Sequence, residues 1–279
     1  RIARVLEDGK FPLAFFDDRL AMPDIYGRDH REAVENGIRV VKMDPSAILS
    51  SMACATTKLG LGATYSTTYY EPYHVARLYA TLDLMTKGRV AWNVVTSMND
   101  SEAANFGLAH QLAHAERYDR AAEHVEVVKG LWDSWDDDPL VLDKRSGRFF
   151  DPAKVHPLNH AGRHYAVRGP LQSGRPVQGH PVIVQAGSSE DGQQLAAATA
   201  EVVFTAQQDI GQARAFAQGL KDRAEAAGRS RDSLLVMPGV SVFVAPTRAE
   251  AQARVDALQQ FIDPAASVHA FKTFLGWDL

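Results

Sequence analysis

Six continuous apolar runs recur along this chain, and each is followed by a longer segment with the spacing of an amphipathic helix. Because the runs are apolar throughout rather than alternating, we expect strands buried on both faces, as in a parallel sheet. Alternating strands and helices are typical of α/β folds, so two architectures remain, an open doubly wound sheet or a (β/α)₈ barrel. The runs cover 12–18, 59–66, 89–97, 181–187, 201–207 and 234–246.

The ends of the chain and its first turn favour the barrel. A doubly wound dinucleotide-binding sheet would carry G-x-G-x-x-G in its first strand-to-helix turn, and that motif does not occur here. The chain opens without a methionine at RIARVLEDGKF, as if a helix were already under way, and stops at FLGWDL directly after a helical pattern. We therefore expect one incomplete TIM (β/α)₈ barrel domain over 1–279, lacking its first strand and its C-terminal part.

One segment, 136–180, breaks the alternation. It is rich in Pro, Gly and Asp and holds short alternating stretches such as RHYAVRG, which predict an insertion with a small hairpin. Three of its histidines are spaced four residues apart, but Pro157 and Gly162 exclude a regular helix, so a surface hairpin is favoured over a metal site. These histidines are His156, His160 and His164.

The composition excludes several classes of protein. Of the 279 residues, 46% are hydrophobic and 23% are charged, which is ordinary for a water-soluble α/β protein. The net charge of −4, without a basic stripe, argues against nucleic acid as a partner, and no apolar stretch is long enough to cross a membrane. The one cysteine, Cys54, cannot form an internal disulfide, so we expect a cytoplasmic protein.

The polar residues at the ends of the expected strands predict the site, because barrel active sites form where strands end and loops begin. They include neither a nucleophile paired with a base nor a set of metal ligands. Neutral hydrogen-bonding groups suit a polar organic ring, so we expect a cofactor that supplies the chemistry. The set is Asp17, Asp18, Thr64, Ser66, Asn93, Thr96, Ser97, Gln185, Gly187, Ser188, Ser189, Thr205 and Gln207.

Asn93 interrupts an apolar run in GRVAWNVVTSMNDSEAANFG. A buried amide without partners costs roughly 1–3 kcal/mol, so either neighbouring backbone or a ligand should bond it. VQAGSSEDG offers a similar choice: its serines and free helix amides could bind phosphate, or a serine could simply cap the helix.

Two further features have competing interpretations. His110 and His114 are four apart, as zinc ligands on a helix could be, but HQLAH lacks the glutamate of H-E-x-x-H, and we expect no metal. Tyr118 is either a helix-face aromatic or a phenol that reaches a phosphate. Trp92 is expected in the core, and Gly88 is expected at the left-handed position after a helix.

Taken together, several stretches resemble the bacterial luciferase-like flavin monooxygenases, in particular the nitrilotriacetate, pristinamycin-synthase and dibenzothiophene-sulfone monooxygenase branch. The resemblance runs from FFDDRLAMPDIYG to FLGWDL. It is carried by TLDLMTKGRVAWNVVTS, NFGL, HAERYDRAAEHVEVVKGLWDSW, FDPAKVHPLNHAGRHYAVRGPL and PVIVQAGSSEDGQQLAAATAEVVFTAQ.

The resemblance implies a TIM barrel that uses reduced FMN. Asp18, Thr64, Asn93 and Ser97 match positions around the isoalloxazine and ribityl chain. The phosphate end matches Tyr118, Gly187, Ser188 and Ser189. Because Asp17 stands where relatives often carry a small residue, the choice between the two carboxylates stays open. The phosphate loop also follows a middle strand, unlike the usual barrel phosphate site.

The implied activity is that of a two-component monooxygenase, which inserts one oxygen atom from O₂ into a small organic substrate through a flavin C4a-hydroperoxide. A separate NAD(P)H:flavin reductase would deliver the reduced FMN, and a homodimer or homotetramer is expected. Ser97 and His114 are the candidate catalytic residues, and 19–43, 97–112 and 136–180 are the candidate lids. The alternatives are a deazaflavin (F420)-dependent oxidoreductase and a flavin-binding protein without turnover.

Overall fold

The computed structural model describes residues 1–24, 29–207, 209–262, 264 and 267–268, so the terminal FLGWDL lies outside the described residues. The chain divides into two compact units, which are treated separately below. The first, here called the sheet unit, comprises residues 1–18, 43–98 and 111–238. The second, the loop unit, comprises residues 19–42, 99–110 and 239–279.

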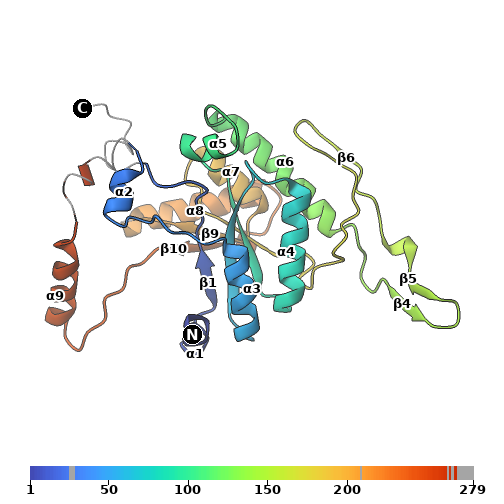
Figure 1. Ribbon diagram of the computed structural model, residues 1–279, viewed down its shortest axis with the longest axis horizontal. Coiled ribbons are helices and arrows are strands. Elements are labelled where there is room, and N and C mark those ends of the chain that lie inside the picture. The colour runs from blue at the N-terminus through green and yellow to red at the C-terminus, as the bar shows by residue number, and fades with distance from the viewer. Residues whose placement is uncertain (25–28, 208, 263, 265–266, 269–279) are drawn as a thin grey trace. The chain divides into compact units, whose positions relative to one another are not determined.

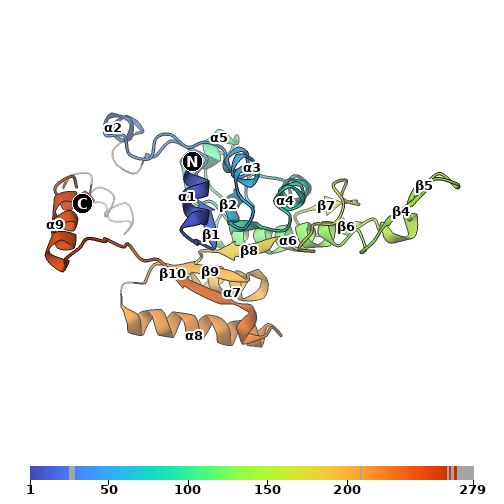
Figure 2. The same cartoon turned by 90° about the horizontal axis from the view of Figure 1, so that it is seen from below.

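The sheet unit is built on one parallel six-stranded sheet (Figures 1 and 2). The strands lie side by side in the order in which they occur along the chain, β1-β2-β3-β8-β9-β10. This order has no point at which it reverses, whereas a doubly wound sheet requires one. The strands are β1 (Leu13–Phe16), β2 (Gly60–Ser66), β3 (Val90–Val95), β8 (Val182–Gln185), β9 (Val202–Thr205) and β10 (Leu235–Pro238).

The helices confirm the barrel topology. Each large helix of the sheet unit packs against the next one along the chain, in the series α3, α4, α6, α7 and α8. Consecutive helices that all neighbour one another lie on one side of a sheet, as in a (β/α)₈ barrel, rather than on both faces. The series is α3 (Pro45–Ala55), α4 (Pro72–Thr86), α6 (His114–Trp132), α7 (Glu190–Thr199) and α8 (Ile210–Ala226), preceded by α1 (Ile2–Asp8).

The helix ends follow the local sequence. Proline occupies the first helical position of both α3 and α4, where its missing N–H is not needed. The Asp44 carboxylate caps α3 by accepting the Ser46 N–H at 2.8 Å. At the end of α4, Lys87 and Gly88 have φ values of 57° and 80°, so the left-handed C-terminal turn expected at Gly88 already begins at Lys87.

The last strand is shorter than expected. We expected a strand over 234–246, but β10 ends at Pro238, and the following residues belong to the loop unit. Proline has no N–H to donate to a neighbouring strand, and Gly239 follows it, so the ladder ends there despite the apolar residues beyond. Among its described residues, the loop unit contains the helices α2 (Arg31–Glu35), α5 (Asp100–Asn105) and α9 (Arg248–Gln259).

The core of the sheet unit lies between the sheet and helices α4 and α6. Trp92, on β3, is fully buried, and its indole N–H donates to the Tyr65 carbonyl at 3.1 Å. Trp132, on α6, is fully buried as well and donates to the Ala76 carbonyl at 3.0 Å. The two rings meet edge to face at 6.3 Å, a favoured aromatic geometry. Trp92 is therefore a core residue, as expected.

The expected insertion holds two short antiparallel hairpins. One pairs β4 (Leu140–Asp143) with β5 (Arg148–Phe150), and the other pairs β6 (His160–Ala161) with β7 (Ala166–Val167). The short 3₁₀ turns are η1 (Pro152–Lys154) in this segment and η2 (Arg231–Ser233) before β10.

The second hairpin is anchored to α6 by one carboxylate. Glu123 accepts hydrogen bonds from His160 Nε2 at 3.0 Å and from the backbone N–H groups of His164 and Tyr165 at 2.9 Å. Burial alone would raise the pKa of Glu123, but these hydrogen bonds outweigh it and lower the pKa to about 2.

We expect Glu123→Gln to destabilise the protein by roughly 1–3 kcal/mol at pH 7, because a charged acceptor of several hydrogen bonds is lost. The folded pKa is depressed from 4.5 to about 2, so the contribution is complete above pH 4.5 and disappears as the pH falls toward 2. Urea unfolding between pH 7 and pH 3 should show the gap between wild type and variant closing. Glu126→Gln, an exposed change on the same helix, is the control; a gap that stays constant with pH would contradict the assignment.

Candidate functional site

Asn93 and Thr64 form a buried polar pair on adjacent strands. Parallel pairing aligns Thr64 of β2 with Asn93 of β3, and Asn93 in turn with Val184 of β8. The two polar side chains are 3% and 4% exposed, and Asn93 Nδ2 donates to Thr64 Oγ1 at 2.8 Å. Asn93 Oδ1 is buried and accepts no hydrogen bond from the part of the chain that the structure describes. Such an atom marks a place where a ligand donor would fit.

Ser97 lies just beyond β3 in a strained conformation. Its φ is +40°, which is uncommon for a residue other than glycine. Its hydroxyl lies 2.9 Å from the Ser66 hydroxyl at the end of β2, and its carbonyl accepts a hydrogen bond from Arg117 Nη1. These contacts hold Ser97 at the carboxyl edge of the sheet.

Arg117 is a candidate site residue that the sequence analysis missed. It lies in the first turn of α6, next to Tyr118, and its Nε is buried without a hydrogen-bond partner among the described residues. A half-buried guanidinium with an unused donor is suited to bind an anion. In the sequence it is one of several charged residues in HAERYDRAAEH, and only its contact with Ser97 distinguishes it.

Gly187 and Gly192 permit a close approach between β8 and α7. A Cβ on Gly187 would lie 2.9 Å from Gly192 Cα and 3.3 Å from the Tyr118 hydroxyl, and a Cβ on Gly192 would lie 2.9 Å from Gly187 Cα. Neither position therefore accepts a side chain without movement of backbone. The Tyr118 phenol points at this junction rather than lying on an outer helix face.

Ser189 caps α7. Its hydroxyl accepts the Gly192 N–H at 3.2 Å, so the capping interpretation of the double serine holds for this residue. Ser188 is exposed, and its carbonyl accepts Gln193 Nε2 at 2.9 Å. The helix begins at the glycine junction, which leaves its positive end directed toward the same edge of the sheet.

His114 joins the first turns of α6 and α7. Its Nδ1 lies 2.9 Å from an Asp191 carboxylate oxygen, and its ring lies 4.9 Å from the Tyr118 ring. His110 belongs instead to the loop unit, where its Nδ1 lies 3.3 Å from Asp100 Oδ2. Within the described ranges no group of three His, Cys, Asp or Glu side chains could hold a metal ion.

Of the two carboxylates after β1, Asp18 is half-buried and Asp17 is exposed. Burial raises the pKa of Tyr70, and the nearby Tyr65 and Asp18 raise it further. The Tyr65 and Tyr70 rings lie 4.5 Å apart, so Asp18 lies within electrostatic range of an aromatic pair.

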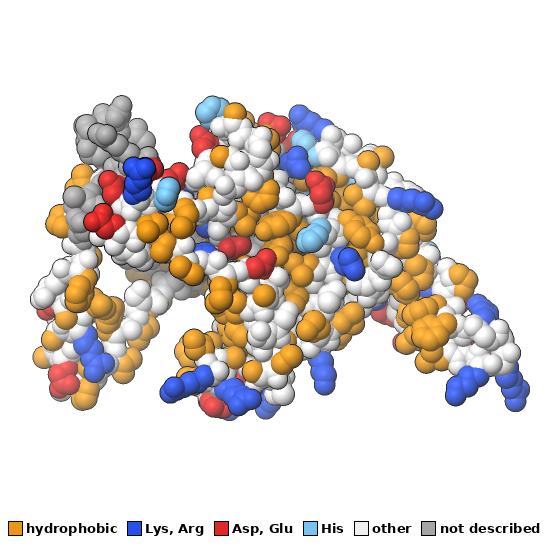
Figure 3. All heavy atoms as spheres, viewed as in Figure 1, with side chains coloured by type: hydrophobic (Ala, Val, Ile, Leu, Met, Phe, Trp, Pro, Cys, Tyr) orange, Lys and Arg blue, Asp and Glu red, His pale blue; other side chains and the backbone are white. Residues whose placement is uncertain are grey.

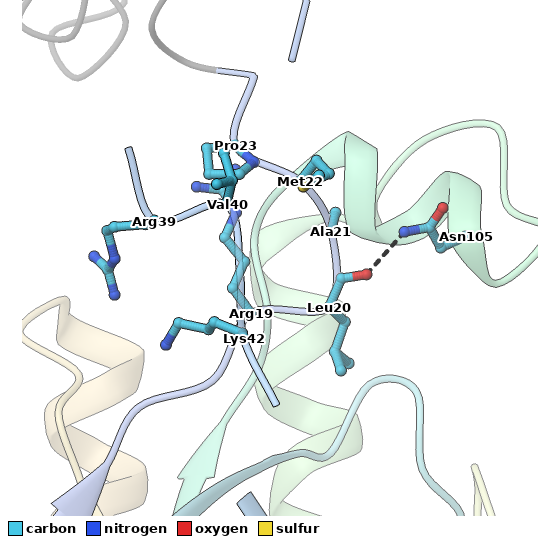
Figure 4. A pocket seen from close by; sticks show the side chains of 9 residues that line it. All are labelled: Arg19, Leu20, Ala21, Met22, Pro23, Arg39, Val40, Lys42 and Asn105. Atoms are coloured by element: carbon cyan, nitrogen blue, oxygen red, sulfur yellow. Dashed lines mark hydrogen bonds between the residues drawn. The ribbon is translucent and has the colours of Figure 1, made fainter. Parts of the chain in front are cut away.

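Within the loop unit, two of the expected lids are fastened together. The Glu102 carboxylate, on α5, accepts the Leu20 N–H at 3.1 Å, and Asn105 donates to the Leu20 carbonyl at 2.8 Å. A cavity of about 340 Å³ opens beside this contact (Figure 4). Its lining combines three cations with apolar side chains: Arg19, Leu20, Ala21, Met22, Pro23, Arg39, Val40, Lys42 and Asn105.

The sheet unit thus gathers most of the expected residues at the carboxyl ends of adjacent strands and the starts of α6 and α7. The loop that follows β8 lies in the middle of the six-stranded order, as expected. The gathered residues are Asp18, Thr64, Asn93, Ser97, His114, Tyr118, Gly187, Ser188 and Ser189.

Comparisons with known proteins agree with this arrangement. The chain is 47% identical over 279 residues to dibenzothiophene-sulfone monooxygenase of Rhodococcus erythropolis, covering 100% of this chain and 62% of that protein. It is 43% identical over 279 residues to nitrilotriacetate monooxygenase component A of Aminobacter aminovorans, covering 99% and 61%. The chain therefore spans about three fifths of the length of these relatives.

One solved structure has a very similar fold. Riboflavin lyase, crystallised with modified FMN and riboflavin, superimposes with a TM-score of 0.93 at 35% identity, covering 99% of this chain and 62% of that one.

No helix in the described part of the chain is long and apolar enough to span a membrane. The family model for luciferase-like monooxygenases matches residues 1–277. The chain belongs to the luciferase-like monooxygenase family.

Proposed function

We propose that this chain is the oxygenating component of a two-component flavin monooxygenase. It would bind reduced FMN delivered by a separate NAD(P)H:flavin reductase and transfer one oxygen atom from O₂ to a small organic substrate. The observation that carries the proposal is the buried Asn93 Oδ1, which has no hydrogen-bond partner among the described residues and lies on the same sheet edge as the glycine junction at the start of α7. The named relatives support it, since one is called component A of a monooxygenase.

The residues fit both ends of FMN. Asn93 and Thr64 would bond the ring or ribityl hydroxyls, with Asp18 and Ser97 beside them. The phosphate would meet Tyr118, Ser188, Ser189 and Gly187, and Arg117 adds a positive charge. Gly187 lies three residues beyond Val184, which pairs with Asn93, so at ~3.3 Å per residue the two ends are ~10 Å apart. That separation suits the ribityl chain between ring and phosphate.

When bound, reduced FMN would supply the activation of O₂, and this chain's residues would bind, orient and exclude water. Ser97 and His114 are the candidates for hydrogen bonding to the reacting oxygen or to the substrate. Asp191 holds His114 at Nδ1, which leaves Nε2 available to carry or accept a proton. The segments 19–43, 97–112 and 136–180 are proposed as lids, and 1–279 as one incomplete barrel domain.

Two other functions use the same barrel. A deazaflavin (F420)-dependent hydride-transfer enzyme would not consume O₂, and a flavin-binding protein without turnover would release no oxygenated product. The monooxygenase names of the two curated relatives favour oxygen transfer. Cytoplasmic location is part of the proposal, because an NAD(P)H-dependent reductase must supply the flavin.

The direct test is oxygen uptake by the complete protein with FMN, NADH and a flavin reductase. The substrate panel should contain sulfur heterocycles, aminopolycarboxylates and alkanes, and hydroxylated or cleaved products should be measured alongside uptake. We expect product formation that depends on both reductase and O₂. Substrate reduction in the absence of O₂, supported by F420 alone, would replace the proposal with the deazaflavin alternative.

The phosphate assignment predicts that Ser189→Asp weakens FMN binding at least tenfold without lowering the melting temperature. Aspartate caps a helix as well as serine does, but its negative charge would repel the phosphate. Ser189→Asn is the matched neutral cap and should bind FMN far better than the aspartate variant.

Riboflavin, which lacks the phosphate, separates this effect from a general disturbance of the site. Fluorescence titrations of the complete protein should show riboflavin affinity within about threefold of wild type in both Ser189 variants. Equal losses for riboflavin and FMN would remove the phosphate from this loop.

The ring assignment predicts that Asn93→Leu impairs flavin binding or the coupling of O₂ uptake to product more than it impairs folding. Leucine is close to asparagine in volume, and the change removes one side-chain hydrogen bond, to Thr64. Thr64→Val breaks the same bond while leaving the Asn93 amide in place, so its melting temperature gives the structural cost of losing that bond alone. A destabilised apoprotein that binds FMN normally would return Asn93 to a purely structural role.

A further inference from the structure

The backbone at the end of β3 is held through successive carbonyl groups. The Val95 carbonyl accepts hydrogen bonds from the Thr67 hydroxyl at 3.1 Å and from the Thr67 N–H at 2.9 Å. The Thr96 carbonyl accepts the Thr68 hydroxyl at 2.6 Å. Because Thr67 and Thr68 directly follow β2, their side chains continue the contact between β2 and β3 beyond the end of β2.

The next carbonyl, that of Ser97, is held from a different element. It accepts a hydrogen bond from Arg117 Nη1, and Arg117 lies in the first turn of α6. Ser97 has a φ of +40°, and a residue other than glycine stays in this region only when surrounding contacts fix it there. The contact from Arg117 therefore falls on a residue whose backbone needs support from outside.

The surroundings of this contact make it hard for water to replace. Arg117 is half-buried, and its Nε is buried. Ser66, whose hydroxyl lies 2.9 Å from the Ser97 hydroxyl, is 3% exposed, and Thr96 is 9% exposed. Loss of the guanidinium would take this donor from the Ser97 carbonyl where water has little access, so the turn should relax toward a commoner backbone conformation.

Arg117 also links Ser97 to the helix that carries the other candidate catalytic residue. His114 and Arg117 are three residues apart, so they lie on the same face of α6. A guanidinium that holds the Ser97 carbonyl from this face limits how far the Ser97 hydroxyl can move relative to the His114 ring. The contact thus fixes the end of β3 to the start of α6, although Ser97 and Arg117 are 20 residues apart in the sequence.

We propose that Arg117 is a positioning residue for oxygen transfer. By holding the Ser97 carbonyl it keeps the strained turn, and with it the Ser97 hydroxyl, in a fixed place relative to His114. This role rests on the proposed function, in which Ser97 and His114 bond the reacting oxygen or the substrate. When the turn is loosened, we expect the two electrons of reduced FMN to leave with O₂ and two protons as H₂O₂ instead of supporting oxygen transfer.

The effect on the backbone can be measured in the complete protein without flavin. The Thr67 N–H donates to the Val95 carbonyl, and the Thr68 N–H donates to Ser66 Oγ at 3.2 Å, so both amides report on this turn. We expect Arg117→Met to speed their hydrogen–deuterium exchange at least tenfold. Arg117→Lys keeps a charged donor and should stay within about threefold of wild type. Arg117→Gln, which is neutral and shorter, should behave as Arg117→Met does and replaces it if that variant fails to fold.

Arg77→Met is the matched control. Arg77 is exposed on α4, so this variant makes the same chemical change away from the turn. On the face of the molecule seen in Figure 3, Lys and Arg side chains lie at several separate places and not in one patch, so a single surface charge adds little to the overall field. The control should leave both the exchange rates and the reaction at their wild-type values.

The effect on the reaction is measured at saturating FMN, with the flavin reductase and a substrate that the complete protein oxygenates. Arg117→Met should lower the product formed per O₂ consumed at least tenfold, with H₂O₂ making up the difference and the substrate KM within about threefold of wild type. Ser97→Ala should lower this coupling to a similar extent. The double variant should lose no more than either single variant, because Arg117 acts through Ser97.

Unchanged exchange at Thr67 and Thr68 in Arg117→Met would overturn the proposal, and so would additive losses in the double variant. A coupling defect that disappears at saturating FMN, with FMN but not riboflavin bound more weakly, would also overturn it, because Arg117 would then act on the phosphate alone. Faster exchange in a protein that oxygenates no substrate would support the held turn and overturn the proposed function instead.

Discussion

Parallel strand pairing in fixed register is the constraint on which the site depends. Because all six strands run the same way, their carboxyl ends share one edge, and the ladder sets Thr64, Asn93 and Val184 side by side. A shift of one residue in any strand would turn its polar side chain to the opposite face. The fully buried Trp92, one residue before Asn93, prevents such a shift, since its large ring would lose its place in the core. Packing in the core thereby fixes the position of a polar atom at the edge.

The sequence carries the elements that create the edge. Long apolar runs predict buried parallel strands, and the absence of a dinucleotide turn favours a barrel, as the unreversed strand order confirms. Most candidate site residues could be found because they follow those runs directly. The strained Ser97 and the glycine junction at Gly187 occur at such strand ends, where turns demand unusual backbone or small residues.

What the sequence leaves out depends on contacts between distant segments. Arg117 resembles any charged residue on a helix until its contact with Ser97 is seen, and the pairing of His114 with Asp191 joins the starts of two helices far apart in the chain. Similarly, Asp83 in the sequence is one polar residue near the end of a helix, yet it is fully buried and accepts two hydrogen bonds from Gln178. Local patterns predict elements, whereas such pairings arise only once the elements are packed.

The contact of Leu20 with Glu102 and Asn105 has a mechanical consequence inside the loop unit. The carboxylate and the amide hold both the N–H and the carbonyl of one residue, so the segment after β1 and the helix after β3 are joined at two points. Displacing either segment alone would leave the Glu102 carboxylate without its backbone donor. Glu102 is only 4% exposed, so water could not easily replace that donor. Within the loop unit the two segments are therefore mechanically coupled, so that one moves only together with the other.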